Sequence, residues 1–198
     1  GKAMKHQSFK PGCYYHVFNR GNNKEKIFLR DGNYDYFLKL LKKYIASVAE
    51  VYSYCLLSNH FHVVLKIKDE ENLPKQISLG NKKLHQPFSN LFNAYAKAFN
   101  KENNRTGSVF QEHLKRVQLD GNDYLKKLIM YINTNPSHHF IEDYKSYKFS
   151  SYQSILSNKE TALKRVEVLR LFDGIENFKY VHALKNTQIG LLKELSLE

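Results

Sequence analysis

Two histidines on one predicted strand give the strongest indication of chemistry in this sequence. The stretch from His60 to Ile67 alternates between apolar and other residues, and this period of two predicts a half-buried β-strand. Its apolar members are Phe61, Val63, Leu65 and Ile67. His60 and His62 therefore point to the opposite face, with Cα atoms roughly 7 Å apart. Imidazoles at this spacing can bind one divalent cation, although two polar residues on the open face of an antiparallel strand give the same pattern.

A second polar pattern lies on a helix predicted from Asp120 to about Asn135. Lys127, Tyr131 and Asn135 follow one another at intervals of four residues, so they share one stripe of that helix. An Asn carbonyl is a hard oxygen ligand that Mg²⁺ or Mn²⁺ accepts alongside imidazole. Tyr131 is then expected beside a phosphate bound to the metal, and Lys127 would stabilise the phosphate or the phenolate. Alone, such a tyrosine indicates packing; together with the two histidines it favours a functional site.

The charge of the chain favours a polyanionic partner. Its 198 residues carry a formal net charge of +12, with a pI near 9.5, and nucleic acid is a better candidate than a membrane surface because no strongly amphipathic cationic helix is present. No run approaches the ~20 apolar residues of a membrane-spanning helix, and residues 1–11 lack the apolar middle of a secretory signal. Cys13 and Cys55 are expected as buried thiols in a reducing cytoplasm.

The predicted elements follow the order strand, helix, strand, strand, helix, strand. Apolar spacing places the strands at residues 13–19, 51–57, 60–67 and 109–119, with a tight link at Ser58-Asn59, and the helices at 34–45, capped by Asp31 or Asn33, and at 88–99. This order is that of the ferredoxin-like layout, an antiparallel sheet with two helices on one face. The face with His60 and His62 stays open until the third helix, capped by Asp120 and ended by Pro136, crosses it.

The connecting and C-terminal segments are less regular. A long polar loop is predicted over residues 69–83. After Ser137 the composition changes to Tyr, Ser and Lys, which predicts an extended packing segment. A helix from about Thr161 to Phe172 and a weaker one near the C-terminus complete the chain.

Four segments of the sequence resemble the signature blocks of the REP-associated tyrosine transposases, which are single-tyrosine HUH (His-hydrophobic-His) transposases. These segments are Tyr15–Gly21, Asn59–His62, Gly107–Gln111 and Tyr131–Pro136. They occur in the family's order and span roughly residues 10 to 155 of the chain. Two positions depart from the family pattern: Ser58 stands where many relatives have Pro, and Val109-Phe110 lacks the Trp often found before Gln.

This resemblance implies an α+β fold, with an HUH transposase domain at residues 1–155, a catalytic helix over the open face of its ferredoxin-like sheet, and a C-terminal helical extension at 156–198. It implies a metal-dependent, single-stranded DNA endonuclease and strand transferase. His60, His62 and Asn135 would bind Mg²⁺ or Mn²⁺, and Tyr131 would be the nucleophile. The family leaves a 5′-phosphotyrosine and a free 3′-OH, and it acts on hairpin-forming repeats in the bacterial cytoplasm, at the nucleoid, as a monomer or homodimer.

Several roles stay open at this stage. Tyrosine has an unperturbed pKa of about 10, so it needs help from the metal, Lys127 or His113 to react at neutral pH. His16 either approaches the site or is an ordinary sheet histidine, and the same question is open for Glu112 and His113 as candidate residues at the edge of the site. The expected DNA-contacting cations are Arg20, Lys24, Arg105, Lys115 and Arg116.

Two other functions compete with the nuclease. A catalytically silent, sequence-specific DNA-binding regulator on the same fold would keep the charge without turnover. A structural zinc protein is disfavoured because the two histidines have no cysteine partners at the spacing of a closed site.

Overall fold

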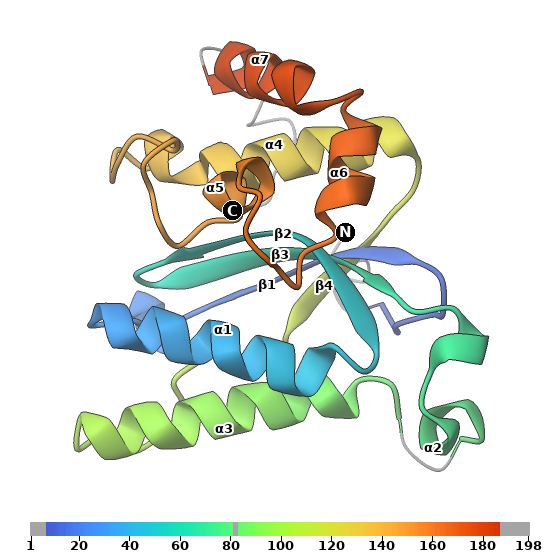
Figure 1. The fold of residues 1–198 in the computed structure, drawn as a ribbon. Helices are drawn as coiled ribbons and strands as arrows, with labels where there is room; N and C mark the ends of the chain where they lie inside the picture. The colour runs from blue at the N-terminus through green and yellow to red at the C-terminus, as the bar shows by residue number, and fades with distance from the viewer. Residues whose placement is uncertain (1–6, 81–82, 187–198) are drawn as a thin grey trace. The chain divides into compact units, whose positions relative to one another are not determined.

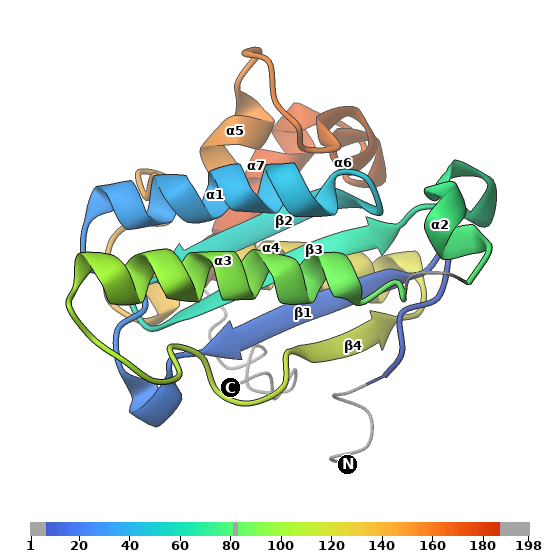
Figure 2. The same cartoon turned by 90° about the horizontal axis from the view of Figure 1, so that it is seen from below.

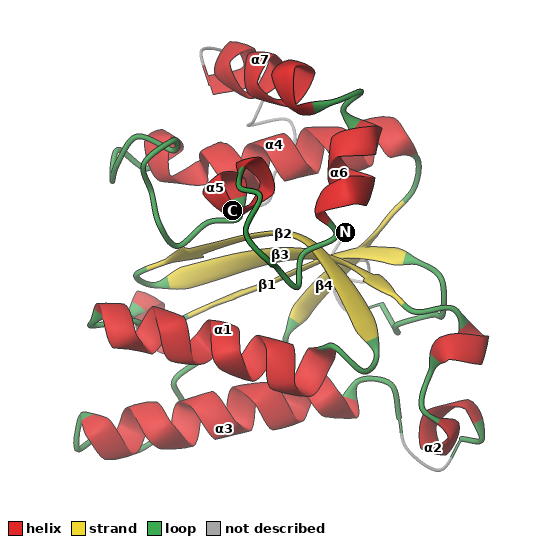
Figure 3. Ribbon diagram, in the orientation of Figure 1, coloured by secondary structure: helices red, strands yellow, loops and turns green. Residues whose placement is uncertain are grey.

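The computed structural model describes residues 7–80 and 83–186, and its elements follow the predicted order (Figures 1 and 3). The four strands are β1 (Tyr14–Arg20), β2 (Ala49–Leu57), β3 (His60–Ile67) and β4 (Lys115–Leu119). The helices are α1 (Asp31–Ile45), α2 (Lys75–Ser78), α3 (Gln86–Glu102), α4 (Asn122–His138), α5 (Tyr152–Leu156), α6 (Arg165–Leu171) and α7 (Ile175–Asn186). Two 3-10 turns, η2 (Asn22–Lys24) and η3 (Glu70–Asn72), complete the described elements.

The strands form one antiparallel sheet in the order β2-β3-β1-β4. β1 lies in the middle, paired with β3 from Tyr14↔Lys66 to Arg20↔His60 and with β4 from Tyr14↔Leu119 to Phe18↔Lys115. α1 and α3 run side by side along one face of this sheet (Figures 1 and 2). The predicted α+β, ferredoxin-like arrangement is confirmed.

The chain divides into two compact units, residues 1–50 with 56–119 and residues 51–55 with 120–198. In the first unit, the core lies between the sheet and α1 and α3. Phe61 of β3 packs against Phe37 of α1 and Phe92 of α3, with ring centroids 5.2 and 5.4 Å away. Because neighbouring residues of a strand point to opposite faces, Phe61 on the helix-covered face turns His60 and His62 to the other one.

Gly21 shows why the chain needs a glycine directly after β1. A Cβ at this position would lie 1.9 Å from the carbonyl oxygen of Glu25. The Gly21 carbonyl accepts a hydrogen bond from the Lys24 amide, which closes η2. The backbone therefore approaches itself too closely for any side chain, and this close turn places Lys24 just beyond the end of β1.

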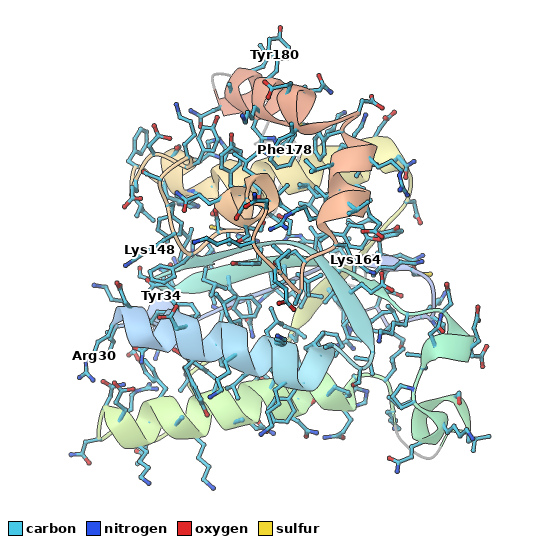
Figure 4. The ribbon with its side chains drawn as sticks, viewed as in Figure 1. Arg30, Tyr34, Lys148, Lys164, Phe178 and Tyr180 are labelled. Atoms are coloured by element: carbon cyan, nitrogen blue, oxygen red, sulfur yellow. The ribbon has the colours of Figure 1, made fainter. Side chains whose placement is uncertain are left out.

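The second unit is helical and includes the middle of β2. Phe178 of α7 is fully buried, and its ring stacks on Tyr152 of α5 with centroids 5.6 Å apart. Tyr180 points away from the other helices of this unit (Figure 4) and is 66% exposed. α7 therefore packs through one side only.

Several predicted boundaries are wrong. β4 begins at Lys115 rather than at residue 109, because the preceding segment turns at His113, whose φ is 62°. α4 begins after Gly121, without a side-chain cap from Asp120, and continues to His138. Pro136 does not end it but lies inside its last turn. The chain after Ser137 is not entirely extended, because it forms α5.

Other expectations fall partly outside the described residues. The predicted loop at 69–83 contains η3 and α2, and its residues 81–82 lie outside the description. So do residues 1–6 and, in the predicted C-terminal extension, 187–198. Both cysteines are free thiols; Cys55 is buried as predicted, whereas Cys13 is only half-buried. Among the described helices, none has the length and hydropathy needed to cross a membrane.

Candidate functional site

The two histidines predicted to bind metal share one face of β3. Their ring centroids are 5.3 Å apart and the ring planes are nearly perpendicular, at 88°. His62 is buried, with 2% of its surface exposed, whereas His60 at the start of the strand is half-buried. As predicted, both imidazoles lie on the face opposite Phe61, but the strand is not half-buried, because His62 and Val64 on the histidine face are buried as well.

A third histidine, His16 of β1, contacts the pair. In the register of β1 and β3, His16 lies opposite Val64 and Phe18 lies opposite His62, so His16 and His62 are diagonal neighbours on one face. Nε2 of His16 lies 2.9 Å from Nδ1 of His62, within hydrogen-bonding distance. The His16 ring stacks on Phe18 with centroids 4.4 Å apart. Burial lowers the pKa of His16 to about 3, so this imidazole is neutral at physiological pH.

Nδ1 of His60, like Nδ1 of His62, lies within hydrogen-bonding distance of a neighbouring side chain. Its Nδ1 lies 2.7 Å from the side-chain oxygen of Asn59, which accepts a hydrogen bond from it. In both histidines, therefore, Nδ1 is engaged by a neighbouring side chain. In each ring, Nε2 is therefore the nitrogen to compare with the predicted metal-binding role.

The other predicted site residues lie on α4. Tyr131 and Asn135 are one turn apart and buried, with 4% and 0% of their surfaces exposed, and Lys127 one turn earlier is exposed. The Tyr131 ring stacks with His138 at 6.1 Å between centroids. Neither the oxygen nor the nitrogen of the Asn135 amide has a hydrogen-bond partner among the described residues. A fully buried amide without partners is costly, and a ligand that binds its oxygen would offset that cost.

A second tyrosine of α4, Tyr124, is half-buried. Burial raises the pKa of its hydroxyl, which disfavours the reactive phenolate. It lies with Lys127 at the edge of a shallow hollow around the start of α4.

The second unit contains a buried polar cluster that the sequence did not reveal. Oδ1 of Asn133 accepts hydrogen bonds from the hydroxyls of Ser53 and Ser151, at 3.0 and 2.7 Å. Nδ2 of Asn133 donates to Nε2 of His182 at 3.1 Å, and Nδ1 of His182 donates to the Phe178 carbonyl at 2.6 Å. Burial lowers the pKa of His182 to about 4. We call these residues the Asn133 cluster; it ties α4 to α7.

Each predicted ligand, taken within its own unit, has donor atoms of a kind that a divalent metal accepts. Among the described residues, no three His, Cys, Asp or Glu side chains are grouped to hold an ion, but the predicted set contains only two such residues together with Asn135. His60 and His62 share a face with Nδ1 held, and Asn135 has a buried carbonyl oxygen without a partner. Two imidazoles and an amide oxygen suit Mg²⁺ or Mn²⁺, which accept nitrogen and oxygen ligands.

The five predicted DNA-contacting cations fall into two groups. Arg105 donates to Asn100 and forms an ion pair with Glu25 at 3.4 Å. Lys115 donates to Gln111 and Asn19, and Arg116 donates to the Gln7 carbonyl. Arg20 and Lys24, in contrast, make no side-chain hydrogen bond or ion pair within the described part of the chain. Of the five cations, these two are therefore the ones that we expect to donate to a phosphate.

Two of the four signature-like segments meet at the end of β1. The Gln111 amide donates to the Arg20 carbonyl, and Nδ2 of Asn19 donates to the Gln111 carbonyl at 3.0 Å. Gln111 and His113 line a hollow of about 770 Å³ beside α3. His113 itself is exposed and lies 3.3 Å from Glu112, so these two residues neighbour each other at the surface.

Comparison with known proteins gives an informative similarity among solved structures. No protein-family model matches the chain, and no curated protein matches it. Among solved structures, the chain is similar to a REP-associated tyrosine transposase bound to a REP hairpin, with a TM-score of 0.56 and 16% sequence identity. The similarity covers 78% of this chain and 84% of that one. At this identity it shows the fold, and the resemblance found in the sequence is confirmed at that level.

Proposed function

We propose that this protein is a metal-dependent endonuclease and strand transferase for single-stranded or hairpin DNA. In this proposal His60, His62 and Asn135 bind Mg²⁺ or Mn²⁺, and Tyr131 is the nucleophile. Lys127 is one helical turn from Tyr131 and stabilises the phenolate. Arg20 and Lys24 contact the DNA backbone.

The observation that carries the proposal is the pair of histidines on β3. Both imidazoles lie on the face opposite Phe61, and each has its Nδ1 held by a neighbouring side chain. A held Nδ1 leaves Nε2 of each ring for a metal. The partnerless amide of Asn135 and the fold shared with a hairpin-bound tyrosine transposase support the same conclusion.

The ligand set explains what the metal would supply. A bound divalent cation withdraws charge from a phosphodiester and stabilises the charge that develops during attack. Two neutral imidazoles and a neutral amide contain no carboxylate, so they do not reduce the cation's charge. Such a site suits binding of an anionic phosphate.

The reaction conserves the energy of the phosphodiester. The Tyr131 oxygen forms a bond to phosphorus while the bond from phosphorus to the 3′-oxygen breaks. The departing 3′-oxygen takes up a proton and becomes a free 3′-OH, and the 5′-phosphate stays covalently bound to the tyrosine. Attack by a 3′-OH on this phosphotyrosine reverses the step and joins strands without ATP.

The test is incubation with a hairpin oligonucleotide that carries a 3′ label and a single-stranded flank, in the presence of Mn²⁺. We expect a labelled covalent adduct that survives denaturing electrophoresis. Tyr131→Phe removes only the attacking hydroxyl, so it should abolish the adduct while hairpin binding persists. Tyr124→Phe, on the same helix, is the matched control and should still form the adduct.

Three outcomes would contradict the proposal. An adduct with Tyr131→Phe would show that another residue attacks. Full activity of His60→Ala in the presence of a chelator would exclude the metal. Hairpin binding by the wild-type protein without any adduct, at every flank and metal tried, would favour the silent DNA-binding regulator.

A further inference from the structure

This inference deepens the proposed function and rests on it, because it concerns how the proposed metal site is built. A neutral imidazole has one nitrogen with a proton and one with a lone pair. A histidine that binds a metal through Nε2 must therefore carry its proton on Nδ1. Such ligands usually donate this N–H to a neighbouring group, which fixes the tautomer and the orientation of the ring.

The atom facing Nδ1 of His62 is Nε2 of His16, 2.9 Å away. The two ring planes are inclined by only 20°, with centroids 5.1 Å apart, so the nitrogens meet nearly edge to edge. The lone pair of an imidazole nitrogen lies in the ring plane, and this geometry directs it at the neighbouring N–H. Stacking on Phe18 and complete burial restrict the His16 ring in turn.

We propose that His16 is a positioning residue for the metal site. Its Nε2 accepts a hydrogen bond from Nδ1–H of His62, and this bond holds His62 in the tautomer that presents Nε2 to the metal. His16 itself does not contact the metal or the DNA.

The other nitrogen of His16 supports this assignment. When Nε2 accepts, the proton of a neutral His16 must lie on Nδ1, and this atom is buried without a hydrogen-bond partner among the described residues. A buried N–H without a partner destabilises a protein. A histidine that served stability alone would be better replaced by an apolar residue, whereas a positioning role gives a reason for its presence.

His60 offers a comparison at the same site. Its Nδ1 is held by the side-chain oxygen of Asn59, which is half-buried. The group that holds His62 is an imidazole and the group that holds His60 is an amide. Neither is a carboxylate, so neither adds negative charge beside the metal. The proposed ligands are therefore oriented by neutral groups, which keeps the site positive toward phosphate.

The experiment compares His16→Leu with His16→Gln by titrating Mn²⁺ into the full chain and following the free ion by electron paramagnetic resonance. Leucine fills the space without an acceptor, and we expect it to weaken Mn²⁺ binding by about tenfold to a hundredfold. A glutamine amide oxygen can occupy the place of Nε2, so His16→Gln should recover most of the affinity. Val117→Ala is the packing control, because Val117 lies opposite His16 on β4, and it should bind Mn²⁺ like the wild type.

A second measurement reports on His62 without metal or activity. Long-range ¹⁵N–¹H NMR of histidine-labelled protein distinguishes the Nδ1–H from the Nε2–H tautomer. We expect His62 in the Nδ1–H form in the wild type and in His16→Gln, and a shift toward Nε2–H in His16→Leu. A merely structural role for His16 would change the melting temperature without this change of tautomer.

The outcomes separate this inference from the proposed function. If the wild type binds Mn²⁺ and His16→Leu binds it equally well, the positioning role is wrong and the metal site stands. An Nε2–H tautomer of His62 in the wild type would also overturn the positioning role. If the wild type binds no Mn²⁺, the proposed metal site is wrong, and the inference is wrong with it.

Discussion

The Asn133 cluster and the histidines of β1 and β3 differ in how completely their buried polar atoms are bonded. Both nitrogens of His182 and both amide atoms of Asn133 have hydrogen-bond partners. His16, equally buried, has a partner for Nε2 but none for Nδ1 among the described residues. A fully bonded cluster stabilises the fold, whereas an incompletely bonded one costs free energy and needs another reason to be there.

The same contrast occurs within α4. Asn133 and Asn135 are two residues apart and both are fully buried. Asn133 is bonded through both amide atoms, and Asn135 through neither. We therefore assign Asn133 to stability and Asn135 to the ligand, and the following predictions test this division in order of decreasing effect on stability.

The largest loss of stability is expected from Asn133→Leu. This change removes one acceptor of the Ser53 and Ser151 hydroxyls and the donor to Nε2 of His182, and all three side chains stay buried. Breaking such a network should lower the free energy of unfolding by about 3–5 kcal/mol. Urea denaturation at pH 7 measures this. An effect below about 1 kcal/mol would show that the cluster contributes little.

His182 should make stability depend on pH. Its pKa is about 6.5 in the unfolded chain and about 4 in the fold, where burial disfavours the charged form. The stabilisation is present above pH 6.5 and is lost as the pH falls toward 4, because the unfolded chain then binds more protons. The loss should be on the order of 3 kcal/mol. The measurement is the free energy of unfolding of the wild type and of His182→Gln at pH 7, 5.5 and 4. If both proteins lose the same free energy of unfolding over this range, the prediction is wrong.

Asn135→Leu should act in the opposite direction to Asn133→Leu. It replaces a buried amide without partners by an apolar side chain of similar size, which should raise the free energy of unfolding by about 1 kcal/mol. Adduct formation and Mn²⁺ binding should be lost at the same time. Denaturation and the adduct assay together check this. A destabilised variant would mean that the Asn135 amide has a structural role.

The smallest effect on stability is expected for Lys24→Ala, compared with Lys115→Ala. Lys24 is exposed and makes no ion pair among the described residues, so its removal should leave the melting temperature unchanged. If it contacts a phosphate, the slope of log affinity against log salt should fall by about 1. Hairpin binding measured by fluorescence anisotropy at several salt concentrations tests this. Lys115 is bonded to Gln111 and Asn19, so its loss should affect local stability more than the salt slope.

Much of the fold followed from local patterns in the sequence. The period-two alternation of residues 60–67 placed His60 and His62 on one face, because the pleat of a strand determines this regardless of its surroundings. The spacing of four between Tyr131 and Asn135 likewise placed them one turn apart on α4. Boundaries were predicted less well: Pro136 was expected to end the helix, yet α4 continues through it to His138.

What the sequence alone determined is therefore the order of the elements and the residues that share a face, since both depend on the geometry of a few consecutive residues. Only the tertiary structure decided that His16 meets His62, because strand register brings together residues separated by 46 positions in the chain. It also decided that Asn133 is bonded and Asn135 is not, since identical residues on one helix differ only in what distant segments place around them. Hydrogen-bond partners depend on long-range packing, and local patterns carry no information about it.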